Sequence, residues 1–140
     1  MDTYSFGYNS STFVDMPISH KIFLAQFDTI KKIADEGPCV IVGRCADYAL
    51  SDYKNVFKLF LYADEDFRIK NLMEFRNISQ KEAKDVMNKL DKQRSSYYNY
   101  YSSKKWGRAE TYDLCINTGI FGVDGTVKLI IQAIEDFENR

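Results

Sequence analysis

The segment at residues 89–108, KLDKQRSSYYNYYSSKKWGR, combines cations with aromatic rings. From residue 81 to residue 108, eight cations face three acids, although the 140-residue chain has a net charge of -1. A local positive patch attracts anions, and aromatic side chains can stack on nucleobases or shield a phosphate group from water. The segment therefore predicts binding of a polyanion. The alternative is a solvated helix whose tyrosines pack on a sheet.

A second candidate site follows the apolar run at residues 39–42, in the sequence IVGRCAD. Ligands of open α/β sheets bind at the carboxyl ends of the strands, and a glycine such as Gly43 permits a sharp turn there. Arg44 then offers a planar, permanently charged group that suits phosphate or carboxylate. This segment alone leaves two interpretations open: Arg44 binds an anion, or it only pairs with Asp47.

Length and composition restrict the class of protein. A chain of 140 residues with 45% apolar residues is suited to one domain with its own core. The sequence has neither a run of about 18 apolar residues nor a secretory signal, so we expect no membrane partner. Cys39, Cys45 and Cys115 show no CxxC spacing, which favours a cytoplasmic setting with thiols in the core. For Cys45, a lowered pKa beside Arg44 is the alternative to packing.

Three runs of β-branched and aromatic residues have the composition of strands, at residues 39–43, 56–62 and 112–119. Helical patterns separate them, and parallel strands need such crossover helices. The sequence therefore predicts an α/β fold with three layers, in which helices cover both faces of a mostly parallel sheet.

Four helices are expected from apolar spacing and from end signals. The first begins at residue 19 and is stopped by Gly37 and Pro38, and the second, at residues 64–77, leaves Arg68 among the cations available to a site. SQKE at residues 79–82 is a capping box that opens a long helix. Asp124 is expected to cap the last helix.

In this order, the motifs resemble the cytidylate kinase-like family, within the nucleoside monophosphate kinases of the P-loop fold. They are GPCVIVGRCADYAL, VFKLFLYADEDFRIKNL, DKQRSSYYNYY with KKW, and YDLCINTG. The similarity covers roughly residues 19 to 138. It implies one domain over residues 1–140, with an irregular arm at 1–18 and a lid-like segment at 89–108.

The resemblance implies phosphoryl transfer from ATP to a nucleoside monophosphate, with Mg²⁺ bridging the donor phosphates. Lys92 and Arg94 would neutralise charge on the transferred group, and Asp91 would hold these cations in place. Such a reaction depends mainly on positioning and electrostatics.

The acceptor-binding residues are also implied by the resemblance. Arg44 would bind the acceptor phosphate, and Asp47 would orient Arg44 or contact the base or sugar. Tyr97, Tyr98 and Lys105 complete the implied set.

The chain contains no G-x-x-x-x-G-K-[ST] loop, which cradles the ATP phosphates in P-loop proteins. In the family this loop follows a first strand that lies between the strands corresponding to residues 39–43 and 56–62. Without that strand, two sheet edges would face a gap. We expect a portion of a longer kinase-like protein, with no donor site and no kinase activity of its own. The alternative is a shortened relative in which the amino-terminal segment or a second copy fills the gap.

Two interpretations that assign a function other than catalysis stay open. A non-catalytic binding module for a nucleotide or RNA would use the same basic helix, but the net negative charge argues against nucleic acid. A structural partner subunit would dimerise without binding a ligand.

Overall fold

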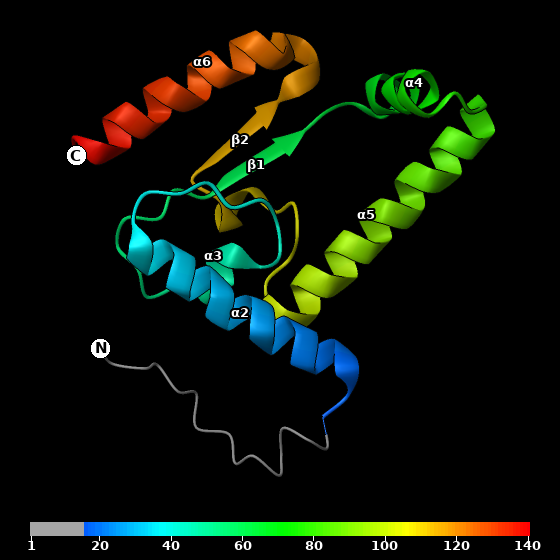
Figure 1. The fold of residues 1–140 in the computed structure, drawn as a ribbon. Helices are drawn as coiled ribbons and strands as arrows, with labels where there is room; N and C mark the ends of the chain where they lie inside the picture. Colours follow the sequence, from blue (N-terminus) through cyan, green and yellow to red (C-terminus); the bar gives the residue numbers. More distant parts are fainter. Residues whose placement is uncertain (1–15) are drawn as a thin grey trace. The chain divides into compact units, whose positions relative to one another are not determined.

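A computed structural model describes residues 16–140, and the chain divides into two compact units, Met1–Asp52 and Tyr53–Arg140 (Figure 1). The irregular arm expected at residues 1–18 lies almost entirely outside the described residues.

The first unit contains helix α2, Ile18–Glu36, and the short helix α3, Ala46–Ala49. The helix predicted from residue 19 is confirmed, and it ends at Gly37, whose φ of 145° suits glycine. The ring of Phe27 lies 5.9 Å from that of Phe23 and 6.0 Å from that of Tyr48. Aromatic contacts therefore pack α3 against α2.

Residues 39–42 do not form the predicted strand. They have no ladder partner within residues 16–140, and the side chains of Val40 and Val42 are 93% and 88% exposed. A strand is defined by hydrogen bonds to a neighbouring strand, and side-chain composition alone cannot supply them.

The second unit contains a parallel pair of strands, β1 (Leu59–Tyr62) and β2 (Leu114–Asn117), which begins with Leu59 opposite Leu114. Asp113 extends the pairing by one step, because its Oδ2 accepts the Lys58 N–H at 2.7 Å and its own N–H donates to the Lys58 carbonyl at 2.8 Å. The α/β class and the parallel pairing are confirmed. Within residues 16–140 the sheet has two strands, so the expected three-layer sheet is not observed there.

Helices α4 (Glu65–Arg76) and α5 (Gln80–Ser102) follow β1. The predicted capping box is present: Ser79 Oγ accepts the Glu82 N–H at 3.3 Å, and Glu82 Oε2 accepts the Ser79 N–H at 2.9 Å. Ile69, Ala83 and Met87 form the buried core of this helix pair. Apolar packing thus holds α4 against α5.

Helix α6, Thr118–Glu138, follows β2 and runs back along the two strands (Figure 1). An additional turn precedes the start predicted at Asp124, and Asn117 caps this turn by accepting the Gly119 N–H at 3.1 Å. The helix is interrupted at Gly122, with φ 66° and ψ -177°. A Gly adopts such a conformation readily, so a first turn can form before the apolar stripe begins.

None of the helices in the described part of the chain combines the length and the apolar character required to cross a lipid bilayer.

Candidate functional site

The carboxyl ends of β1 and β2 are tied together by polar side chains. Thr118 Oγ1 donates to the Tyr62 carbonyl at 3.1 Å, and Asn117 Nδ2 donates to Asp64 Oδ1 at 3.3 Å. Helix α4 begins directly after Asp64. The strand ends, where ligands of α/β proteins usually bind, therefore determine where the first turn of α4 lies.

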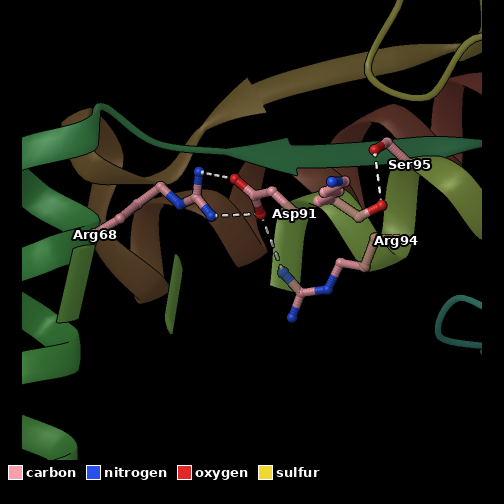
Figure 2. Close-up of polar contacts among 5 residues, drawn as sticks. Arg68, Asp91, Arg94 and Ser95 are labelled. Atoms are coloured by element: carbon pink, nitrogen blue, oxygen red, sulfur yellow. Dashed lines mark hydrogen bonds and ion pairs between the residues drawn. The ribbon is translucent and has the colours of Figure 1, made fainter. Parts of the chain in front are cut away.

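Arg68, near the start of α4, forms a two-pronged ion pair with Asp91 of α5 (Figure 2). Its Nη1 donates to Oδ2 at 2.8 Å and its Nη2 donates to Oδ1 at 2.7 Å. The two side chains are 32% and 26% exposed, so the pair is partly shielded from water. Hydrogen bonds to Asp91 raise the pKa of Arg68 above its ordinary value, which keeps this cation charged.

Arg94 of α5 approaches the same carboxylate, with Nη1 3.5 Å from Asp91 Oδ1 (Figure 2). We call Arg68, Asp91 and Arg94 the Asp91 cluster. One carboxylate orients two guanidinium groups, so the cluster has a net charge of about +1. Each guanidinium has five N–H donors, of which Arg68 uses two on Asp91. The remaining donors of both guanidinium groups are available to phosphate oxygens.

Lys92 is exposed and forms no ion pair within residues 16–140; its backbone carbonyl accepts the Ser95 hydroxyl at 3.2 Å. Neighbouring residues of a helix point in different directions, which separates the Lys92 side chain from the Asp91 carboxylate. Of the two cations that Asp91 was expected to hold, the structure brings Arg94 to it and adds Arg68. The catalytic role of Lys92 stays a prediction.

Arg44, in the first unit, lies in a left-handed turn. Gly43, Arg44 and Cys45 have φ angles of 69°, 59° and 54°. Left-handed conformations cost non-glycine residues on the order of 1–3 kcal/mol and are concentrated at ligand-binding sites. Arg44 is exposed and forms no ion pair within the described residues, so it is not held by half-buried Asp47.

Cys45 is 4% exposed, and burial, followed by the charge of Asp47, raises the pKa of its thiol to about 11. The alternative of a lowered pKa beside Arg44 is wrong. This thiol is a core group.

The two candidate tyrosines differ in their surroundings. Tyr98 is 7% exposed and stacks on Tyr112, with ring centroids 6.4 Å apart, so its ring is engaged in packing. Tyr97 is half-buried and lies edge-on to Tyr101 at 4.9 Å. Contact of either ring with a ligand stays a prediction, and the packing alternative describes Tyr98 better.

Lys105 lies in the loop after α5 and not in the Asp91 cluster. A helix rises about 1.5 Å per residue, so α5 covers roughly 16 Å from Asp91 to its last residue, Ser102. The lid-like segment at residues 89–108 therefore contains two separate groups of cations. Sequence analysis could note Arg68 as an available cation but could not place it beside Asp91, 23 residues away.

The described residues contain no group of three or more His, Cys, Asp or Glu side chains placed to hold a metal ion. The Mg²⁺ that the resemblance implies therefore has no such cluster of side chains among residues 16–140.

Comparisons with known proteins place this geometry in context. The model of the cytidylate kinase-like family matches residues 1–120, and so begins before residue 19, where the motif resemblance starts. A crystal structure of an uncharacterized protein from Eubacterium ventriosum is 37% identical, with a TM-score of 0.80; the match covers 91% of this chain and 81% of that chain. The search of curated proteins finds no match. The family match and the 37% identity together show that the chain belongs to the cytidylate kinase-like family.

Proposed function

We propose that this chain carries the acceptor-binding part of a nucleoside monophosphate kinase, a transferase for which CMP is the first candidate acceptor. Residues 1–140 bind the acceptor nucleotide and hold the transferred phosphoryl group. The donor, ATP with Mg²⁺, requires a P-loop that these 140 residues do not contain.

The observation that supports this function is the Asp91 cluster. Near the carboxyl ends of the strands, Asp91 holds Arg68 by two hydrogen bonds and lies 3.5 Å from Arg94, and both guanidinium groups keep donors for a ligand. In phosphoryl transfer, the group leaving ATP bonds to an oxygen of the acceptor phosphate while ADP departs, and charge spreads over its equatorial oxygens. Preorganised cations stabilise that charge without reorganising at the moment of reaction.

The individual roles follow from this chemistry. Arg68 and Arg94 bind oxygens of the acceptor phosphate and, during transfer, of the phosphoryl group that joins it, and Asp91 is a positioning residue that acts through them. Lys92 adds positive charge from the neighbouring helix position. For the first unit, the resemblance supports a separate contact of Arg44 with an acceptor phosphate and of Asp47 with a base or sugar.

Calorimetric titration of CMP, and separately of ATP, into the purified 140-residue chain tests the proposal. We expect CMP to bind and Arg94→Ala to weaken its binding about tenfold or more, because a hydrogen bond to a charged group is worth about 1.5–3 kcal/mol. Arg76→Ala is the matched control, since it removes an exposed arginine from the last turn of α4. It should change the affinity less than about twofold.

We expect no phosphorylation of CMP by these 140 residues, and we expect Arg94→Ala to leave any binding of ATP unchanged, because no P-loop holds ATP beside the Asp91 cluster. Turnover comparable to that of an intact kinase would contradict the assignment of the donor site to other residues. Equal losses of CMP affinity in Arg94→Ala and Arg76→Ala would instead show that only the total positive charge matters. That result would overturn the role of the Asp91 cluster.

A further inference from the structure

A second group of cations lines an open pocket of about 600 Å³ at the opposite end of the strands from the Asp91 cluster. Lys58 precedes β1, whereas Lys104, Lys105 and Arg108 lie between α5 and β2. All belong to the second unit. The pocket therefore lies at the amino ends of the strands, and the second half of α5 separates it from Asp91.

The loop that presents these cations is held in place by hydrogen bonds. Asn99 Oδ1 accepts the backbone N–H of Trp106 at 2.7 Å, and Ser102 Oγ accepts the backbone N–H of Lys104 at 3.1 Å. The Tyr112 hydroxyl accepts the Gly107 N–H at 3.2 Å. A ligand would thus meet a loop whose backbone is already ordered, which lowers the entropic cost of binding.

Aromatic packing fixes the same loop on β1. The ring of Phe60 stacks on Tyr112 at 4.8 Å and lies edge-on to Trp106 at 5.3 Å. Gly107, with φ 76°, lies beside the same ring, because a Cβ there would be in van der Waals contact with Phe60 at 3.4 Å. Lys58, directly before β1, and the loop that bears Lys104 and Lys105 are consequently connected through the packing on Phe60.

The charge of the pocket is not balanced by the protein. Glu110 is its single acid and pairs with Arg108, with Nε 3.2 Å from Oε2. Lys58, Lys104 and Lys105 form no ion pair within residues 16–140. Four cations and one acid give a net charge of about +3, and an anion would relieve the repulsion among them.

The lining indicates the class of anion. The neutral groups around the cations are those of Asn99, Ser103 and Thr111, which can supply hydrogen bonds. No aromatic side chain is among the described residues that line the pocket, so it offers no surface on which a nucleobase could stack. We propose that this pocket binds a compact oligophosphate group, such as that of a di- or triphosphate, at a site separate from the Asp91 cluster.

Titration of inorganic tripolyphosphate into the full 140-residue chain at fixed ionic strength tests this site. We expect Lys104→Ala plus Lys105→Ala to weaken binding about tenfold or more, because two charge-assisted contacts are lost. The matched control is Lys81→Ala plus Lys89→Ala, which removes the same charge from exposed positions of α5 outside the pocket. We expect it to reduce affinity less than about threefold.

Three results would overturn the proposal. The first is that binding of tripolyphosphate does not depend on Lys104 and Lys105, seen either as no binding or as equal losses of affinity in the two double variants. The second is loss of binding in Arg94→Ala with full binding in the Lys104 and Lys105 variant, which would place the anion in the Asp91 cluster. The third is tighter binding of single-stranded RNA than of tripolyphosphate, dependent on the same lysines, which would make the pocket part of a nucleic-acid surface. Since CMP binding is measured separately, failure here leaves the proposed kinase function unaffected.

Discussion

Two apolar runs of this chain have the composition of strands but different structures. Residues 39–42, CVIV, have no ladder partner within residues 16–140 and expose two valines almost completely. Residues 59–62, LFLY, form β1 and pair in parallel with β2. Each run lies in its own unit and is followed by a candidate ligand-binding residue, Arg44 in one and Arg68 in the other.

The difference shows that an apolar run forms a strand only where a neighbouring strand supplies hydrogen-bonding partners. β1 has hydrogen-bonded partners in β2, an extra pairing step through Asp113, and aromatic rings on both sides of Phe60. The CVIV run has a similar β-propensity but none of these contacts in the described part of the chain. Propensity measures how well a residue fits a pleated surface, so it is expressed only where such a surface exists.

The largest effect on stability is expected when an aspartate replaces an apolar residue in the β1–β2 pair and, for comparison, in the CVIV run. Ile116 of β2 is 4% exposed, and Ile116→Asp should lower the free energy of unfolding of the second unit by about 3–5 kcal/mol or prevent its folding. The equivalent change in the other run, Val40→Asp, should cost less than about 0.5 kcal/mol because Val40 is already in water. Urea unfolding followed by far-ultraviolet circular dichroism measures both. Similar losses of unfolding free energy in the two variants would show that Val40 is buried and would contradict its exposure.

An intermediate effect is expected at the start of the β1–β2 ladder. Asp113→Ala removes the acceptor of the Lys58 N–H and should destabilise the second unit by about 1 kcal/mol. Asp113→Asn keeps a side-chain oxygen and should recover most of that loss. Asp52→Ala, an exposed acid of the first unit, is the control. No difference between Asp113→Ala and this control would mean that the side-chain bond does not support the pairing.

The smallest perturbation is a chemical label on two cysteines, Cys39 at the start of the CVIV run and Cys45 in the turn that follows it. Only the thiolate reacts, so a raised pKa slows labelling below that pKa. With a pKa of about 11, roughly one in a thousand Cys45 thiols is ionised at pH 8. Exposed Cys39 should therefore be alkylated rapidly in the native chain and Cys45 slowly, with Cys45 accelerating as pH rises toward 11. Peptide mass mapping after timed iodoacetamide treatment measures the two rates, and slow labelling of Cys39 would contradict its exposure.

Local signals predicted much of this fold. Gly37 and Pro38 marked the end of α2, and Ser79 with Glu82 marked the start of α5, because capping depends on residues close in sequence. Parallel pairing of β1 with β2 followed from the helices between the strands. These features depend on residues close together in the sequence or on the crossover helices that parallel strands require.

The errors and omissions involve longer-range contacts or competing caps. The CVIV run was expected to be a strand because its composition does not show whether a partner is present. Asp124 was expected to begin the last helix, but Asn117 caps it earlier and Gly122 accommodates the break. For the candidate site, sequence analysis named Asp91 and Arg94. It could not assign Arg68 to Asp91, because that contact depends on how α4 packs on α5.

The central claim is that the Asp91 cluster binds the phosphate of a nucleoside monophosphate. The most direct test is to follow the arginine Nε–H signals by nitrogen-15 NMR while CMP is added to the 140-residue chain. The account predicts that the signals of Arg68 and Arg94 shift together and saturate with CMP, whereas those of Arg76 and Arg108 stay in place. Bound CMP that leaves the Arg68 and Arg94 signals unchanged would contradict it.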